Sequence, residues 1–391
     1  MAGLNRLRPK LVVVPNDPIA AYERAGYDML ESYFNPTNMF GEVSVLSPLE
    51  QGERRAFGML IRGIAVRDFS RALMEIRPDV VRAYGGRRPA ALVCHNRVHD
   101  VPVIVSVHDD RRERIHTSVR YADLVVCLSN AVREHVLDAG VDPNRIRTLP
   151  NRVDTTKFRP IADRSALELV ANRFPPGKHI LHIGRSDRQK NPDTVIRALQ
   201  LLAPEYSCVF VGMGDKSPYV ALAEELGVQK RCFWIDAVKN SELPAWYSWC
   251  DCFCVPSRFE GFGIVFIEAA ACGTPIITSD IAPMNEYLTH DVSACLVKDF
   301  TEPRALAAAI QKVCEDSRYR QRISQGALSI APSFDKDVVD AAEAAIYKEA
   351  LTLPSLSLHR RFEIARGRAL DALRSGFDRY PKVLGKALLG R

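Results

Sequence analysis

Short apolar runs alternate along the chain with longer segments whose apolar residues recur at helical spacing. That alternation is typical of parallel β-sheets with crossover helices. The expected strands fall into two sets, residues 11–14, 43–46, 80–84, 91–94, 103–107, 124–127 and 146–149, and residues 180–183, 208–211, 232–235, 252–255, 275–278 and 294–297. The pattern predicts two Rossmann-like, doubly wound α/β domains that face each other and bind ligands beyond the carboxyl ends of their strands.

The boundary between these sets lies at residues 158–178, where prolines stand at positions 160, 175 and 176. A chain of 391 residues is also too long for one typical core. We therefore expect an N-terminal domain over residues 1–165, a C-terminal domain over residues 176–350, and a separate tail over residues 351–391.

Composition indicates an ordinary globular protein of the cytoplasm. No apolar run reaches the ~18–20 residues that a membrane-spanning helix needs, and the first residues lack the apolar core of a signal peptide. The cysteines lie mostly inside apolar runs, which suits buried, reduced thiols better than a disulfide framework.

The charge of the chain is concentrated in its tail. Between His359 and Arg391 there are nine Lys or Arg residues and three acids, so this segment carries +6, as much as the whole chain. Apolar residues such as Phe362 and Leu370 recur there at near-helical spacing. A basic amphipathic helix of this kind either lies on an anionic membrane surface or packs on the protein's own surface, and both alternatives stay open.

The residues with the clearest chemistry follow the expected strand at 252–255. Two glutamates, Glu260 and Glu268, stand on either side of a turn that contains Gly261 and Gly263, and an apolar helical segment follows. Glycines in such a turn let backbone N–H groups approach a ligand, and a helix N-terminus attracts anions. Carboxylates beside it accept hydrogen bonds from hydroxyl groups, so the combination suits a sugar nucleotide.

This stretch resembles the E-x7-E motif of the retaining glycosyltransferases of family 4, which have the GT-B fold. Three further segments resemble that family: residues 182–192 (HIGRSDRQKNP), residues 122–129 (ADLVVCLS) and residues 149–154 (LPNRVD). In the last of these Arg152 stands where the family usually has glycine. The loop after the first strand, PNDP at residues 15–18, also departs from the family's double-glycine loop.

The resemblance assigns roles to these side chains. Arg185 and Lys190 are two cations at the mouth of a strand, and they suit a diphosphate whose charge grows as the glycosidic bond breaks. Glu268 is expected to accept hydrogen bonds from the nucleotide ribose, and Glu260 to lie near the sugar. The backbone N–H groups expected to meet the sugar or phosphate belong to Gly261, Phe262, Gly263 and Ile264.

Three weaker candidates complete the expected site. His108 ends a strand of the first domain and resembles the family's histidine near the transferred sugar, where it positions sugar or acceptor. Gly212 and Gly214 form a partial dinucleotide fingerprint whose third glycine is replaced by Ser217. The loop that contains Val238 is expected to flank the nucleotide base.

The sequence thus predicts a retaining hexosyltransferase that moves sugar from a nucleotide-diphosphate sugar to a hydroxyl of a glycan or lipid-linked acceptor, in cell-surface polysaccharide or glycolipid synthesis. No D-x-D pair follows an expected strand, so we expect no metal, and no cofactor besides the donor. Contact with a membrane surface is possible through the tail, and nucleic acid is not expected as a partner. The alternatives are a sugar-nucleotide epimerase and a non-catalytic protein that binds membrane or nucleic acid.

Overall fold

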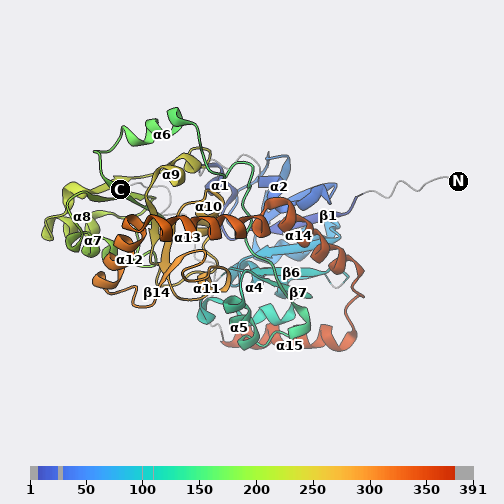
Figure 1. Cartoon of the computed structure of the whole chain (residues 1–391). Coiled ribbons are helices and arrows are strands. Elements are labelled where there is room, and N and C mark those ends of the chain that lie inside the picture. Colours follow the sequence, from blue (N-terminus) through green and yellow to red (C-terminus); the bar gives the residue numbers. More distant parts are fainter. Residues whose placement is uncertain (1–7, 25–29, 99, 109, 375–391) are drawn as a thin grey trace.

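The computed structural model describes residues 8–24, 30–98, 100–108 and 110–374. Within them the chain forms two sheets, each covered by helices on both faces (Figure 1). The eight-stranded sheet has the order β3 (Glu53–Ala56), β4 (Met59–Gly63), β2 (Glu42–Ser47), β1 (Lys10–Val14), β5 (Val80–Tyr84), β6 (Val103–Val107), β7 (Leu124–Cys127) and β8 (Ile146–Thr148). All its neighbouring pairs are parallel except β3 and β4.

The second sheet is parallel throughout. Its order is β11 (Cys232–Ile235), β10 (Tyr206–Val211), β9 (Lys178–Ile183), β12 (Cys252–Val255), β13 (Ile276–Ser279) and β14 (Cys295–Val297). The chain moves outward from β9 in one direction and then returns to start again at β12. The order of strands therefore reverses between β9 and β12, and such a reversal opens a crevice beyond the carboxyl ends of the two strands.

The helices that cover the sheets follow the expected crossover pattern. Around the first sheet lie α1 (Ile19–Arg24), α2 (Leu30–Phe34), α3 (Phe69–Ile76), α4 (Arg88–His95) and α5 (Asn130–Asp138). Between and around the strands of the second sheet come α6 (Arg164–Ala171), α7 (Pro192–Leu201), α8 (Ser217–Glu225), α9 (Leu243–Trp249), α10 (Ile264–Ala271), α11 (Met284–Tyr287), α12 (Pro303–Glu315) and α13 (Ser317–Ile330).

One expected strand is wrong. Residues 91–94 belong to α4, which has a proline in its first turn and buries Ala90, Leu92, Val93 and Cys94. Four apolar residues in a row suit a buried helix as well as a strand, and proline is favoured at a helix start. The sequence prediction also missed the β3–β4 hairpin, because β3 is polar and lies at the edge of the sheet. Phe57 and Gly58, both with positive φ, join its two strands, as tight hairpin turns require.

The C-terminal segment returns to the first sheet. Helix α14 (Lys336–Thr352) crosses to that side in Figure 1, and its Val339, Ile346 and Tyr347 pack into the same core cluster as β1 and β2. Helix α15 (Leu358–Arg374) follows on the outer face beside α4, where Ile364 is buried. The tail helix therefore packs on the protein's own surface along part of its length, while residues 375–391 lie outside the described residues.

Buried charges hold α14 in place. Arg82 of β5 is 2% exposed and lies 2.5 Å from the carboxylate of Glu343 on α14, which is itself fully buried. Arg152 pairs with the same Glu343 and with Asp340. Arg152 stands where the family that the sequence resembles usually has glycine, and it places a second cation against the two buried carboxylates. Breaking such a pair leaves an uncompensated charge, which costs several kcal/mol.

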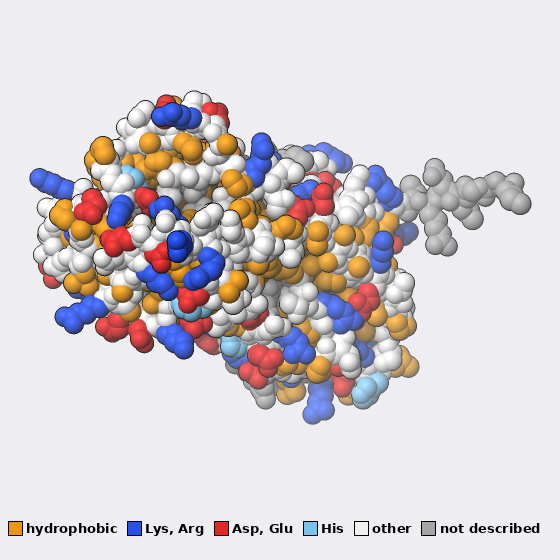
Figure 2. All heavy atoms as spheres, viewed as in Figure 1, with side chains coloured by type: hydrophobic (Ala, Val, Ile, Leu, Met, Phe, Trp, Pro, Cys, Tyr) orange, Lys and Arg blue, Asp and Glu red, His pale blue; other side chains and the backbone are white. Residues whose placement is uncertain are grey.

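The surface shows no large basic patch on the face drawn in Figure 2, where Lys and Arg side chains alternate with Asp and Glu. All ten cysteines are buried and unpaired. No described helix is long and apolar enough to cross a membrane.

Candidate functional site

The turn after β12 has the local structure that its sequence predicts. Gly263 adopts φ +82° and stands at the N-cap of α10, so the chain reverses there in a conformation that favours glycine. A Cβ at this position would lie 2.6 Å from the ring of Phe266. The glycine therefore lets the helix begin directly above the crevice between β9 and β12, and its N-terminus offers a positive dipole end there.

Glu260 lies in this turn and forms the centre of the site. Its side chain is 6% exposed and pairs with the ammonium group of Lys190, which follows β9. Ser257 donates a hydrogen bond to the same carboxylate at 2.8 Å, and Gln189 donates a longer one at 3.3 Å. The reversal of strand order brings these residues together although about seventy positions separate Lys190 from Glu260. Ser257 and Gln189 carried no signal in the sequence, since their role depends on this juxtaposition.

Arg185 lies at the mouth of the same crevice but differs from Lys190 in exposure. Its side chain is 68% exposed, donates to Gln189 at 2.9 Å and pairs with Asp187 at 3.2 Å. Lys190, by contrast, is 12% exposed and held by Glu260. Arg185 thus faces solvent and can change its conformation to contact an anion, whereas Lys190 is fixed in a buried pair.

Glu268 lies one turn into α10 and is buried. It accepts a hydrogen bond from the Tyr247 hydroxyl of α9 at 2.9 Å. Burial raises the pKa of Glu268 to about 7, although the Tyr247 hydrogen bond and the charge of Lys190 both act in the opposite direction. The carboxyl group is therefore poised to change its charge near neutral pH. Sequence reasoning did not find Tyr247, because an aromatic residue in an amphipathic helix usually belongs to the core.

His108 reaches the site from the first sheet. It follows β6, and its ring is perpendicular to that of Tyr84, with 6.1 Å between the centroids. Burial and, to a lesser extent, the nearby charge of Arg82 lower the pKa of His108 to about 4. The imidazole is consequently neutral at physiological pH, so it can hydrogen-bond a sugar hydroxyl without carrying charge.

The two halves of the molecule meet at Gly261. A Cβ on this glycine would lie 2.2 Å from the carbonyl oxygen of His108, and the Ser129 hydroxyl donates to the Gly261 carbonyl at 3.1 Å. Glu286 adds a second link, because its carboxylate accepts from the backbone N–H groups of Asn130 (2.7 Å) and Ala131 (2.8 Å) at the start of α5. The local sequence around Glu286 gives no signal for this role, because its partners lie on α5 of the first domain. The structure thus brings His108 against the glutamate turn.

The remaining predicted residues surround this centre. Phe262 is buried and stacks on Tyr287, so only its backbone is available to a ligand, whereas Ile264 is 39% exposed. Gly212 and Gly214 have φ of +150° and +125°, and a Cβ on either would approach the backbone of residues 184–186 to 3.0 Å or less. Both glycines therefore let the loop after β10 approach the loop after β9 closely. Val238 is half-buried against the core, and no structural contact tests its predicted role at the base.

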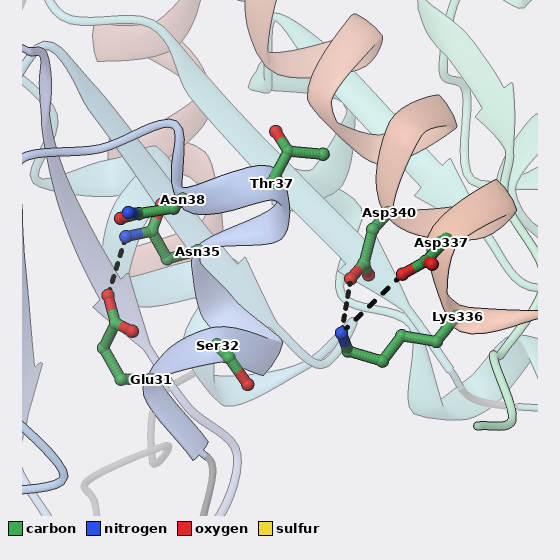
Figure 3. A pocket seen from close by; sticks show the side chains of 8 residues that line it. All are labelled: Glu31, Ser32, Asn35, Thr37, Asn38, Lys336, Asp337 and Asp340. Carbon is green, nitrogen blue, oxygen red and sulfur yellow. Dashed lines mark hydrogen bonds and ion pairs between the residues drawn. The ribbon is translucent and has the colours of Figure 1, made fainter. Parts of the chain in front are cut away.

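A separate cavity lies between the first domain and the start of α14 (Figure 3). It is lined by Glu31, Ser32, Asn35, Thr37, Asn38, Lys336, Asp337 and Asp340. Lys336 bridges toward the carboxylates of Asp337 and Asp340, and Asn35 donates to Glu31 on the opposite wall. None of the predicted site residues lines this cavity, and its walls carry more acids than bases, so it does not suit a diphosphate.

Comparisons with known proteins agree with this architecture. The family model "Glycosyltransferase Family 4" matches residues 11–157, and "Glycosyl transferases group 1" matches residues 169–329. The D-inositol 3-phosphate glycosyltransferase of Xylanimonas cellulosilytica is 32% identical over 221 residues, which are 54% of this chain and 53% of that protein. The chain thus spans about half the length of the curated relatives it matches.

Solved structures show the same fold. Anabaena HepE in complex with UDP and glucose has a TM-score of 0.74 and 18% identity, covering 87% of this chain and all of that one. A glycosyltransferase from Rickettsia africae has a TM-score of 0.72 and 16% identity, covering 89% and all of that chain. A family model matches the chain of each sheet, and Lys190, Ser129 and the glutamate turn, from three of the family motifs, meet at one site. The chain belongs to the group 1 glycosyltransferases and has their two-domain GT-B fold.

Proposed function

We propose that this protein transfers a hexosyl group from a nucleotide-diphosphate sugar to a hydroxyl acceptor, with retention of the anomeric configuration. The observation that carries the proposal is the cluster of Lys190, Glu260 and exposed Arg185 around the N-terminus of α10, with His108 of the other domain against the same turn. The cations and the helix N-terminus suit a diphosphate, and Glu260 and His108 suit sugar hydroxyl groups. A ligand that carries both parts therefore matches the site.

The donor diphosphate would bind where positive charge converges. The largely exposed Arg185 would exchange its pair with Asp187 for phosphate oxygens, and the backbone N–H groups at the start of α10 would point their dipole at the leaving group. Lys190 adds a fixed cation whose carboxylate partner, Glu260, lies beside the sugar. As the glycosidic bond breaks, charge accumulates on the β-phosphate, and these groups stabilise it more than they stabilise the intact donor.

Retention follows if the acceptor hydroxyl approaches from the side of the departing phosphate. The phosphate oxygen then takes the hydroxyl proton while the new bond forms on the face that the leaving group has left. No carboxylic acid has to protonate a diphosphate, so neither glutamate acts as a glycosidase acid. Neutral His108 would position the sugar or the acceptor, and the close approach of its carbonyl to Gly261 would help to exclude water from the reacting groups.

Related proteins suggest which donor to test first. HepE binds UDP and UDP-glucose, so a uridine-diphosphate sugar is our proposed donor class. The D-inositol 3-phosphate glycosyltransferases suggest a small hydroxylated acceptor, and a glycan or lipid-linked acceptor of cell-surface polysaccharide or glycolipid synthesis is the alternative. We propose that the reaction takes place in the cytoplasm and needs neither a metal ion nor a further cofactor.

Peripheral membrane contact belongs to the same proposal. On α15, Leu358 and Phe362 are 82% and 71% exposed beside a row of arginines, which suits an anionic lipid surface. Co-sedimentation with phosphatidylglycerol vesicles should decrease when Phe362 is replaced by Ser, and unchanged binding would remove this part of the proposal.

The function is tested with the purified full chain. Thermal stabilisation by a panel of UDP- and GDP-sugars identifies the donor, because a ligand of the native state raises the melting temperature. Acceptor-dependent release of nucleotide diphosphate then separates transfer from epimerisation, and NMR of the product anomer tests retention. Lys190→Ala should lower kcat/KM by about 100-fold or more.

Lys312→Ala is the matched control, because Lys312 also pairs with a carboxylate, Asp291, but lies on α12 with 45% exposure. It should leave kcat/KM unchanged. Wild-type turnover in both Lys190→Ala and Glu260→Gln would refute the proposed site. Nucleotide release that ignores the acceptor would instead favour another reaction on the same fold.

A further inference from the structure

Three potential metal ligands meet on the outer side of the first domain. His95 is the last residue of α4, His116 is the N-cap of the short helix η4 (Thr117–Tyr121), and Asp371 lies on α15. One ligand atom from each lies within 4.8 Å of the others, and His95 Nε2 is 3.3 Å from Asp371 Oδ2. Residues from three separate segments therefore converge on one point.

The cluster is screened from solvent. The side chains of His95 and Asp371 are only 15% and 10% exposed. Burial lowers the pKa of His95, and the neighbouring His116 lowers it further, while Asp371 acts in the opposite direction. Arg368 also lowers this pKa from nearby, and its positive charge will reduce the affinity for a cation.

The approach of α15 is built into the packing. Gly367 lies one turn before Asp371, and a Cβ there would stand 1.7 Å from the Tyr121 hydroxyl. Glycine at this position lets the helix come close enough for Asp371 to reach the two histidines. Arg360, two turns before Gly367, donates to the Ala122 carbonyl at 3.1 Å and anchors the start of the helix. The carboxylate is therefore held at the histidines by contacts that do not depend on it.

We propose that His95, His116 and Asp371 form a site for a zinc-type divalent transition-metal ion, with water in the remaining position, that fastens α15 to the first domain. Two imidazoles and a carboxylate are typical ligands of Zn²⁺ and Co²⁺. Bonds of about 2.0–2.2 Å require the ligand atoms to move together by roughly 1 Å. His116 Nδ1 accepts a hydrogen bond from the Ser118 backbone N–H at 3.1 Å and lies 2.9 Å from the Ser118 hydroxyl, and these contacts fix the orientation of its ring.

This site is separate from the proposed transfer reaction. Helix α15 packs on α4 and η4, and Figure 1 shows it at the outer side of the first domain, well away from α10. The ion would act on the docking of the tail helix and take no part in sugar transfer. The expectation that sugar transfer needs no metal ion therefore does not conflict with this proposal.

The test uses the full chain, stripped with a chelator and titrated with Zn²⁺ by calorimetry and with Co²⁺ by visible absorption. One ion per chain should bind. His95→Gln and Asp371→Asn should each weaken binding by about tenfold or more, with unchanged circular dichroism. Zn²⁺ should also slow proteolysis at residues 353–357, between α14 and α15, in the wild type but not in His95→Gln.

His359→Gln is the matched control, since His359 lies on the same helix and pairs with Glu363 at 3.4 Å but is 84% exposed. It should bind Zn²⁺ like the wild type. The proposal is overturned if the wild type binds no ion, or if His95→Gln binds as tightly as the wild type. A Co²⁺ spectrum with thiolate charge-transfer bands would likewise overturn it, because it would place the ion at cysteines.

Discussion

Replacing Gly261 by Ala tests the contact that joins the two halves of the site. The added Cβ would stand 2.2 Å from the His108 carbonyl oxygen and 3.3 Å from its carbon. An ordinary carbon–oxygen contact is about 3.2 Å or longer, so the two backbones must separate by roughly 1 Å. Both atoms are backbone, and no flexible side chain can move to relieve the overlap. The domains themselves must therefore move apart.

The magnitude follows from that displacement. Overpacking a close contact costs about 1–3 kcal/mol, and misplacing reacting groups by about 1 Å lowers a rate by about 100-fold. We expect Gly261→Ala to lower kcat/KM for sugar transfer by about that factor while the protein stays folded. Small-angle X-ray scattering should report a larger radius of gyration, and this measurement does not depend on knowing the substrates.

Gly227→Ala is the control for this substitution. Gly227 has φ +69° and nothing within 4 Å of the added Cβ, so alanine there introduces only backbone strain of about 1–2 kcal/mol. It should lower the melting temperature without affecting transfer or scattering. If Gly261→Ala retains wild-type kcat/KM and an unchanged scattering profile, the apposition of His108 and the glutamate turn does not exist in solution, and the reasoning is wrong.

Two further predictions concern buried charges. Because the pKa of Glu268 is raised to about 7 from its ordinary 4.5, folding takes up a proton between these values and this group's contribution to stability falls as pH rises through them. In urea denaturation, the free energy of unfolding of Glu268→Gln relative to the wild type should increase between pH 5 and pH 8, by up to about 3 kcal/mol. A difference that does not change with pH would contradict the raised pKa. Arg152→Ala should cost about 3–5 kcal/mol in the same assay, because Asp340 and Glu343 stay buried. Arg147→Ala, which loses a half-exposed pair with another acid of α14, should cost about 1 kcal/mol or less; equal losses would show that the Arg152 cluster adds nothing.

Much of the candidate site could be read from local sequence because its parts are local structures. Glycine at position 263 predicted a turn before a helix, and its positive φ confirms the reason for that residue. The apolar runs predicted nearly all the strands because fully buried parallel strands are apolar on both faces. The exceptions were residues 91–94, too short a run to distinguish strand from helix, and the polar edge strand Glu53–Ala56.

Partners across the fold lay beyond sequence reasoning. Arg185 and Lys190 looked like equivalent cations in one motif, yet only Arg185 faces solvent, since the strand reversal places Glu260 beside Lys190. Glu286 had no assigned role until α5 of the other domain presented its N-terminus to it. Such contacts depend on which strands become neighbours, and spacing along the chain carries no information about that.

The amino-acid sequence by itself determined the family, the α/β class and the position of the glutamate turn, because backbone conformation and burial depend mainly on nearby residues. Only the tertiary structure decided that His108 touches Gly261, that Arg152 anchors the returning helix α14, and that His95, His116 and Asp371 meet. Those groups lie on segments far apart in the chain. Their distances are set by strand order and helix packing, where many weak contacts summed over the whole molecule select one arrangement.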